Sequence, residues 1–177
     1  MPIDNNDIIN AIKTNPEQGF RELMSMFKEP VYWHIRRLVA RHEDAQDAAQ
    51  ETFVRIYRSL DQYSGERSFS AWIYRIATNE ALRMIERNNR RAIQAHDETA
   101  ADFTADAYID YTDVEAVKLQ RAIHTLPNKQ QVAFNLRYYD EMSYEEIADV
   151  TGSTASAVKS NYHLAKERIV EYLRSND

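Results

Sequence analysis

The sequence predicts an all-α protein made of two small helical domains joined by an acidic linker, the C-terminal domain being a helix-turn-helix. Only three of the 177 residues are Gly and four are Pro, so few residues interrupt helices. Apolar residues recur at the i, i+3, i+4, i+7 spacing of a helix almost throughout. The pattern fails in one segment rich in Ala and Asp, and there we expect the two domains to part.

The first predicted domain covers residues 8–91 and consists of amphipathic helices. Apolar residues around Ile8 and Ile12 indicate a short helix, which ends before Pro16. The same spacing predicts three further helices, over 20–39, 44–60 and 69–91.

Negative charge is concentrated between the two domains. The chain has 28 acidic and 22 basic residues, a net charge of −6. Residues 92–117 hold seven of the acids and no Lys or Arg, so 21 acids face 22 bases in the rest of the chain. Like charges and few apolar groups disfavour folding, which predicts a flexible acidic linker over 92–115. The overall acidity therefore does not exclude binding of nucleic acid by the remainder.

The second predicted domain covers residues 116–174 and contains the pattern of a helix-turn-helix. Pro127 is expected at the first position of one helix. Ser143 and Glu146 fit a capping box that starts the next helix, which should stop at Gly152 because glycine tolerates a positive φ. The following helix presents short polar and basic side chains suited to base edges and phosphates. These residues are Ser153, Thr154, Ser156, Lys159, Ser160, Asn161 and His163. A helical hairpin with a merely soluble face is the alternative.

A stripe of arginines follows the long helix expected over 69–91. The side chains recur about every four residues and so share one face, around the central amide of Asn79. Trp72 lies on a neighbouring stripe. Basic groups near aromatic rings suit the tracking of phosphates with contact to exposed bases, although a solvated basic face is the other interpretation. The stripe consists of Arg75, Arg83, Arg87, Arg90 and Arg91.

Acidic and amide side chains gather on one face of the helix expected over 44–60. They are Asp44, Asp47, Gln50 and Glu51. Such a face could bind a basic partner, or it could simply be solvated. A metal site is not predicted, because no His lies three or four residues away and no second carboxylate motif accompanies it.

No arrangement of residues typical of catalysis is present. The five His form no HExxH motif, there is no glycine-rich phosphate loop, and the absence of Cys excludes thiol chemistry and disulfides. The polar start is unlike a signal peptide, and no apolar run approaches the roughly 18 residues of a membrane span. We expect a cytoplasmic, non-enzymatic protein with no cofactor and no membrane insertion.

Three segments in this order resemble the extracytoplasmic-function (ECF) group of bacterial sigma factors in the sigma-70 family. The first is "DAQDAAQETFVRIYRSL", the second "FSAWIYRIATNEALRMIERNNRR", and the third "LPNKQQVAFNLRYYDEMSYEEIADVTGSTASAVKSNYHLAKERI". The resemblance extends from about Phe20 to Leu173. It implies an initiation factor that binds core RNA polymerase and promoter DNA, and whose activity is held by an anti-sigma factor.

The resemblance implies a role for each candidate surface. The face around Asp47 would dock on the clamp helices of the polymerase. Asn79, with the preceding "SGERSF" loop, would hold a base flipped out of the melted −10 element, while the arginine stripe follows the DNA backbone. The second helix of the helix-turn-helix would enter the major groove at the −35 element.

One position departs from the family. The family often has Arg where this chain has Asn161, so one phosphate contact is lost and the −35 preference is left open. Two other functions also remain open from the residues alone. One is a stand-alone helix-turn-helix regulator, and the other is a helical adaptor whose basic stripe is only solubilising.

Overall fold

The computed structural model describes residues 4–95 and 112–176, and both ranges are folded as helices joined by short turns. The first range contains α1 (Asn5–Thr14), α2 (Pro16–Leu38), α3 (His42–Ser59), a single 3-10 turn (Leu60–Gln62) and α4 (Phe69–Ala95). The second contains α5 (Val114–His124), α6 (Asn128–Tyr138), α7 (Tyr144–Thr151) and α8 (Ala155–Ser175). We call them the N-terminal half and the C-terminal half. The all-α prediction is confirmed.

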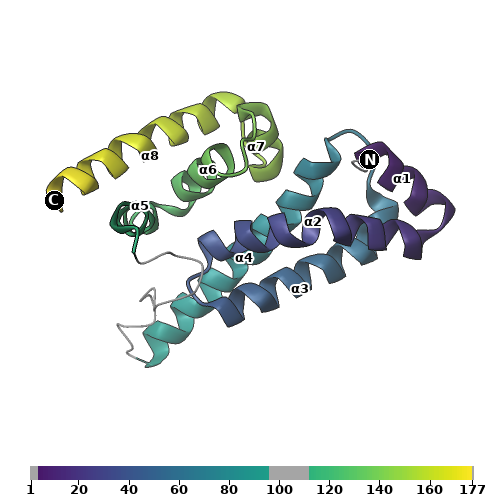
Figure 1. The fold of residues 1–177 in the computed structure, drawn as a ribbon, viewed down its shortest axis with the longest axis horizontal. Coiled ribbons are helices and arrows are strands. Elements are labelled where there is room, and N and C mark those ends of the chain that lie inside the picture. The colour runs from purple at the N-terminus through teal and green to yellow at the C-terminus, as the bar shows by residue number, and fades with distance from the viewer. Residues whose placement is uncertain (1–3, 96–111, 177) are drawn as a thin grey trace.

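The N-terminal half is a bundle of α2, α3 and α4, with α1 packed across the start of α2 (Figure 1). The side chains of Leu23, Ile56 and Ile73, one from each long helix, are completely buried at its centre. Gly19 allows α1 to approach closely, because a Cβ there would lie 2.5 Å from the backbone nitrogen of Ile12. Pro30 lies inside α2 without ending it, so the second predicted helix is continuous.

The C-terminal half is a smaller bundle in which α8 packs against α5, α6 and α7. Its own core is formed by residues of α5, α6, α8 and the α5–α6 turn: Ala122, Ile123, Leu126, Phe134, Ala165 and Ile169. Six residues make a small core, which limits the stability this half has by itself.

The apolar core of the N-terminal bundle continues into the C-terminal half. Figure 1 shows the C-terminal half lying along one side of the N-terminal bundle, and α4 contacts α7 while α2 contacts α6. Leu136, Ile147 and Val150 belong to the same buried apolar cluster as Ile73 and Ala77 of α4. The C-terminal half therefore has a small core of its own and also contributes to the larger core of the N-terminal bundle.

The ends of the helices differ from the sequence predictions by a few residues. Helix α4 continues to Ala95 and α5 begins at Val114, so both helices extend into the range expected to be linker. Residues 96–111, most of the predicted acidic linker, lie outside the described residues. Pro127 is the N-cap of α6 rather than its first helical residue.

Candidate nucleic-acid interface

Asn79 lies on the exposed face of α4 between two buried polar anchors. On one side, the hydroxyl of Thr78 lies 2.8 Å from Nε2 of His34 in α2, and both side chains are buried. On the other side, the carboxylate of Glu80 is buried and pairs with Arg55 of α3 at 2.6 Å. The backbone that carries Asn79 is therefore fixed to two different helices, and its exposed amide side chain extends from a rigid support.

An aromatic cluster supports the loop that leads into α4. The ring of Trp72 stacks on that of Phe69 with centroids 5.9 Å apart, and Tyr63 packs against both rings. The hydroxyl of Tyr63 donates a hydrogen bond of 2.5 Å to the carbonyl of Arg67, which ties the loop to itself. Gly65 in this loop has a φ of +81°, a conformation that favours glycine. Trp72, a predicted DNA contact, is half-buried within this cluster.

Three of the five arginines in the predicted stripe contact other groups among the described residues. Arg75 is a half-buried residue, and its guanidinium donates to the carbonyl of Asp149 in α7 at 3.3 Å. Arg83 is exposed and pairs with Glu80 one turn earlier, and Arg90 is exposed and pairs with Glu86 at 3.4 Å. Arg87 and Arg91 are also exposed. The four exposed arginines are those best placed for phosphates.

Two of the four residues of the predicted acidic face on α3 contact other side chains, and the other two line a groove. Asp44 is half-buried and accepts a hydrogen bond from Asn88 of α4 at 3.0 Å, and Glu51 pairs with Arg55 at 3.2 Å. Asp47 and Gln50 are exposed, and both line a groove of about 1150 Å³ between α2 and α3.

The groove between α2 and α3 is mainly apolar. Phe20, Met24, Phe53 and Tyr57 line it, and the rings of Phe20 and Tyr57 meet edge to face at 5.1 Å. Sequence reasoning missed this groove because it counted these residues as core. The exposed ring of Tyr57 on an otherwise amphipathic helix was the available signal.

The helix-turn-helix has the expected local structure. Ser143 and Glu146 form the predicted capping box, and α7 ends at Gly152, whose φ is +66°. The hydroxyl of Thr154 caps α8 by accepting from the backbone N–H of Ala157 at 3.1 Å, so this predicted contact residue also has a structural role.

The remaining predicted residues of α8 and its entry are mostly on the surface. His163 pairs with Glu167 at 3.3 Å, and Asn161 is half-buried. The other four are exposed: Ser153, Ser156, Lys159 and Ser160.

The two candidate DNA-reading surfaces face each other. A cavity of about 350 Å³ lies between the halves, and Asn79 and Leu82 of α4 line it together with Ser153 and Asn161. A space of this size suits a small molecule and is far too small for duplex DNA. No sequence pattern indicated that these residues lie together.

A buried polar cluster also crosses between the halves. Asp140, in the turn after α6, accepts a hydrogen bond of 3.0 Å from the hydroxyl of Tyr74. The same carboxylate lies 3.7 Å from the guanidinium of Arg37 and 3.8 Å from Nδ1 of His34. The Arg37 guanidinium also stacks over the ring of Tyr139 at 4.3 Å.

The electrostatics of this cluster follow from its burial. Burial, aided by the positive charge of Arg37, lowers the pKa of His34 to about 3. Burial raises the pKa of Asp140, although Arg37 and the Tyr74 hydroxyl oppose that shift. Burial and the neighbouring Asp140 carboxylate raise the pKa of Tyr74 well above its usual value. His34 is therefore neutral at pH 7.

Comparison with known proteins identifies the family. Residues 23–91 match the family model for sigma-70 region 2, and residues 116–169 match the model for sigma-70 region 4. The RNA polymerase sigma-H factor of Pseudomonas aeruginosa is 30% identical, over 94% of this chain and 92% of its own length. The ECF RNA polymerase sigma factor SigW of Bacillus subtilis is 29% identical, over 94% of this chain and 95% of its own length. The chain belongs to the ECF group of the sigma-70 family.

Solved structures of low sequence identity have the same fold. CnrH, in complex with the cytosolic domain of CnrY, superimposes with a TM-score of 0.74 at 19% identity, covering 96% of this chain and 97% of that one. The sigma factor RpoE of Bartonella quintana, in complex with the anti-sigma factor NepR, gives a TM-score of 0.70 at 21% identity. The match covers 89% of this chain and 98% of that one.

Because it belongs to the sigma-70 family, this chain is a non-catalytic factor of transcription initiation. The region 2 match covers most of α2 together with α3 and the greater part of α4, and the region 4 match covers nearly all of the C-terminal half. Within residues 4–95 and 112–176, no three His, Asp or Glu side chains gather as a metal site would require. None of the helices described there is long and apolar enough to cross a membrane.

Proposed function

We propose that this sigma factor directs core RNA polymerase to promoters by reading a −10 element with α4 and a −35 element with α8. The observation that carries the proposal is the setting of Asn79, an exposed amide on a backbone held by two buried anchors. An amide can both donate to and accept from a base edge. A rigid support reduces the entropy lost when a flipped base is captured.

The polymerase docks, in this proposal, at the groove between α2 and α3. Asp47 and Gln50 supply polar groups at its edge, and Phe53 and Tyr57 supply apolar area within it. This combination suits a helical partner that carries basic side chains, because apolar anchors provide affinity and complementary charge provides orientation. The clamp helices of the polymerase are the proposed occupant.

The −35 element is assigned to α8 and its N-terminal turn. Ser156, Lys159 and Ser160 are exposed along the first two turns of the helix, where a recognition helix contacts base edges and phosphates. Asn161 stands where the family often has Arg, and its side chain is half-buried, so we assign it no phosphate contact.

Promoter binding requires the two halves to separate. Promoter elements two DNA turns apart are separated by about 70 Å, whereas here the two reading surfaces line one small cavity. The 18 residues from 96 to 113, between the ends of α4 and α5, span at most roughly 60 Å when extended and about 25 Å as a free coil. A large partner that holds the halves apart is therefore needed, and core polymerase fits this requirement.

An anti-sigma factor is also a proposed partner. CnrH was solved with the cytosolic domain of CnrY, and the Bartonella RpoE was solved with the anti-sigma factor NepR. Both have the fold of this chain, which supports an inhibitor that binds this sigma factor before the polymerase does.

The function is tested by promoter opening with reconstituted holoenzyme. Asn79→Ala should leave polymerase binding intact and reduce permanganate-reactive thymines in the −10 region, because unstacking a base costs a few kcal/mol that the pocket no longer offsets. Asn89→Ala, an exposed Asn ten residues later on α4, is the matched control and should open promoters normally. An unchanged bubble in Asn79→Ala would remove this residue from the site. Tight, sequence-specific binding of duplex DNA by the free chain would favour a stand-alone regulator instead.

A further inference from the structure

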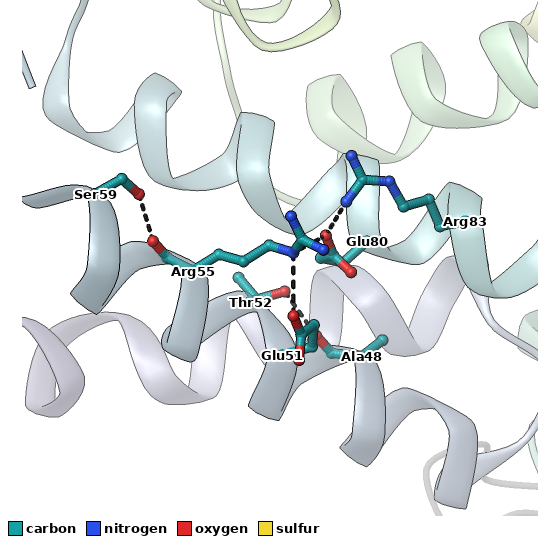
Figure 2. Close-up of polar contacts among 7 residues, drawn as sticks. All are labelled: Ala48, Glu51, Thr52, Arg55, Ser59, Glu80 and Arg83. Atoms are coloured by element: carbon teal, nitrogen blue, oxygen red, sulfur yellow. Dashed lines mark hydrogen bonds and ion pairs between the residues drawn. The ribbon is translucent and has the colours of Figure 1, made fainter. Parts of the chain in front are cut away.

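Arg55 of α3 connects the proposed docking face to the helix that carries Asn79. Figure 2 shows its guanidinium between Glu51, on the docking face, and Glu80, the neighbour of Asn79 on α4. Its Nε lies 2.6 Å from Oε1 of Glu80 and 3.2 Å from Oε1 of Glu51. The Glu80 side chain is only 8% exposed, whereas Arg55 is about half exposed.

The buried carboxylate of Glu80 requires a cation from another helix to fix its position. An unpaired buried carboxylate is strongly unfavourable, so Glu80 is held wherever its partners lie. Arg83 also pairs with Oε1 of Glu80, but it belongs to α4 and moves with that helix. Arg55 belongs to α3, so its ion pair with Glu80 fixes α4 relative to α3.

Hydroxyl side chains bond to backbone carbonyls of α3 near Arg55. The backbone carbonyl of Arg55 accepts a hydrogen bond from the hydroxyl of Ser59, and the hydroxyl of Thr52 donates 2.7 Å to the carbonyl of Ala48 one turn earlier (Figure 2). These bonds lie within α3, so it is the guanidinium of Arg55 that makes the link to α4.

The two carboxylates compete for one cation. Nε of Arg55 is the nitrogen that forms the ion pair with both Glu51 and Glu80. When a basic partner binds Glu51 on the docking face, Arg55 loses that competitor and its pair with Glu80 tightens. Docking on α3 and the position of Asn79 on α4 are thereby coupled through one guanidinium.

Building on the function proposed above, we infer that Arg55 is a positioning residue that acts through Glu80 to place Asn79 for the −10 base when polymerase is bound. Arg55 need not touch the DNA. The competing interpretation is a purely structural ion pair between α3 and α4, which would affect stability alone.

The test combines Arg55→Ala with Asn79→Ala in a double-mutant cycle. Holoenzyme at saturating core polymerase is incubated with promoter DNA, and the open fraction is measured by permanganate reactivity. Arg55→Ala is expected to reduce opening about tenfold in the wild-type background and to have little further effect in the Asn79→Ala background, because both changes remove the same contact. Core affinity should change by less than about threefold.

Two further variants separate positioning from stability. Arg55→Lys keeps the charge and should restore most of the opening. Arg41→Ala removes another Arg–Glu pair at the start of α3, the exposed one between Arg41, its N-cap residue, and Glu43, and should open promoters normally. The thermal unfolding midpoint is recorded for every variant.

Each outcome has one interpretation. If Asn79→Ala opens promoters normally, the proposed function fails and Arg55 has no site to position. If Asn79→Ala is defective but Arg55→Ala opens normally, only the positioning role is overturned. It is also overturned if the two defects multiply, or if the loss of opening simply follows the loss of thermal stability.

Discussion

Helix α4 has two buried sides that differ in how well their polar groups are satisfied. Towards α3, Glu80 is paired with two arginines, and Asn88 donates 3.0 Å to Asp44. Towards the C-terminal half, the described contacts leave Oδ2 of Asp140 and Nδ1 of His34 without a hydrogen bond. An unmade buried hydrogen bond costs roughly 1–3 kcal/mol, which offsets part of the gain from apolar burial. We infer that the first side is built to stay closed and that the second is built to separate.

The largest expected effect comes from placing a charge between the halves. Leu82 is half-buried on the face of α4 that lines the shared cavity, opposite Val132 and Ala133. Leu82→Asp should cost the closed form about 3 kcal/mol, from lost apolar contact and a poorly solvated carboxylate. Small-angle scattering of the free chain should show a larger radius of gyration. Ile93→Asp, at a position 75% exposed on the same helix, is the control. An unchanged radius for Leu82→Asp would mean that the halves do not separate.

Acid should weaken the side that faces the C-terminal half. The pKa of His34 is about 3 in the folded protein, below the usual 6.5, so the folded state excludes a proton that the unfolded state binds. Stability is therefore full above pH 6.5 and falls as the pH drops towards 3. Between pH 7 and pH 5 the His34 contribution to the free energy of unfolding should fall by about 2 kcal/mol.

Other polar and titratable groups face His34, so a variant that removes only His34 is needed to isolate its contribution. They are Thr78, Arg37, Asp140 and Tyr74. The raised pKa of Asp140 acts in the opposite direction, since protonation of that carboxyl favours the closed form as the pH falls. Urea unfolding of His34→Gln at pH 7 and pH 5 should show a pH dependence smaller by about 2 kcal/mol. If His34→Gln kept the full pH dependence, the neutral, buried state of His34 would be refuted.

The two buried carboxylates provide a direct comparison of the sides of α4. Glu80→Gln removes the anion of Arg83 and one of the two anions of Arg55, and should lower the free energy of unfolding by about 2 kcal/mol. Asp140→Asn removes a carboxylate that is only partly satisfied and should cost less than about 1 kcal/mol. Urea unfolding at pH 7 measures both. Equal losses would show that the two sides are equally well satisfied.

The smallest expected effect on stability comes from Arg87, in the exposed part of the arginine stripe on α4. Arg87→Ala should change the free energy of unfolding by less than about 0.5 kcal/mol, because the side chain is exposed. If Arg87 contacts a phosphate in the holoenzyme, the slope of log affinity against log salt should fall by about one. A salt slope identical to that of the wild type would remove Arg87 from the DNA backbone path.

Local signals in the sequence predicted much of the fold. The apolar spacing located the long helices to within a few residues, and the capping box at Ser143 and the stop at Gly152 follow from residue chemistry alone. The candidate surfaces were also predicted, since a helical period places Asp47 or Asn79 on a face without tertiary information.

Contacts between elements could not be predicted in the same way. The helical period gave no sign that Arg75 contacts the carbonyl of Asp149 or that Arg83 pairs with Glu80. Asp140 follows α6 in an unremarkable turn, and only the folded chain brings it to Tyr74, 66 residues away in sequence. Whether a charged side chain meets solvent or a buried partner depends on packing between distant segments, which periodicity does not encode.

The contact between the halves is strengthened because the chain joins Ala95 to Val114 covalently. Because the halves are tethered, closure is an intramolecular step whose effective concentration is of millimolar order for a short connection. A contact too weak to hold separately expressed halves together would still keep the intact chain mostly closed. Cleavage of the connection would then release the two halves from each other without altering any residue at the surface where they meet.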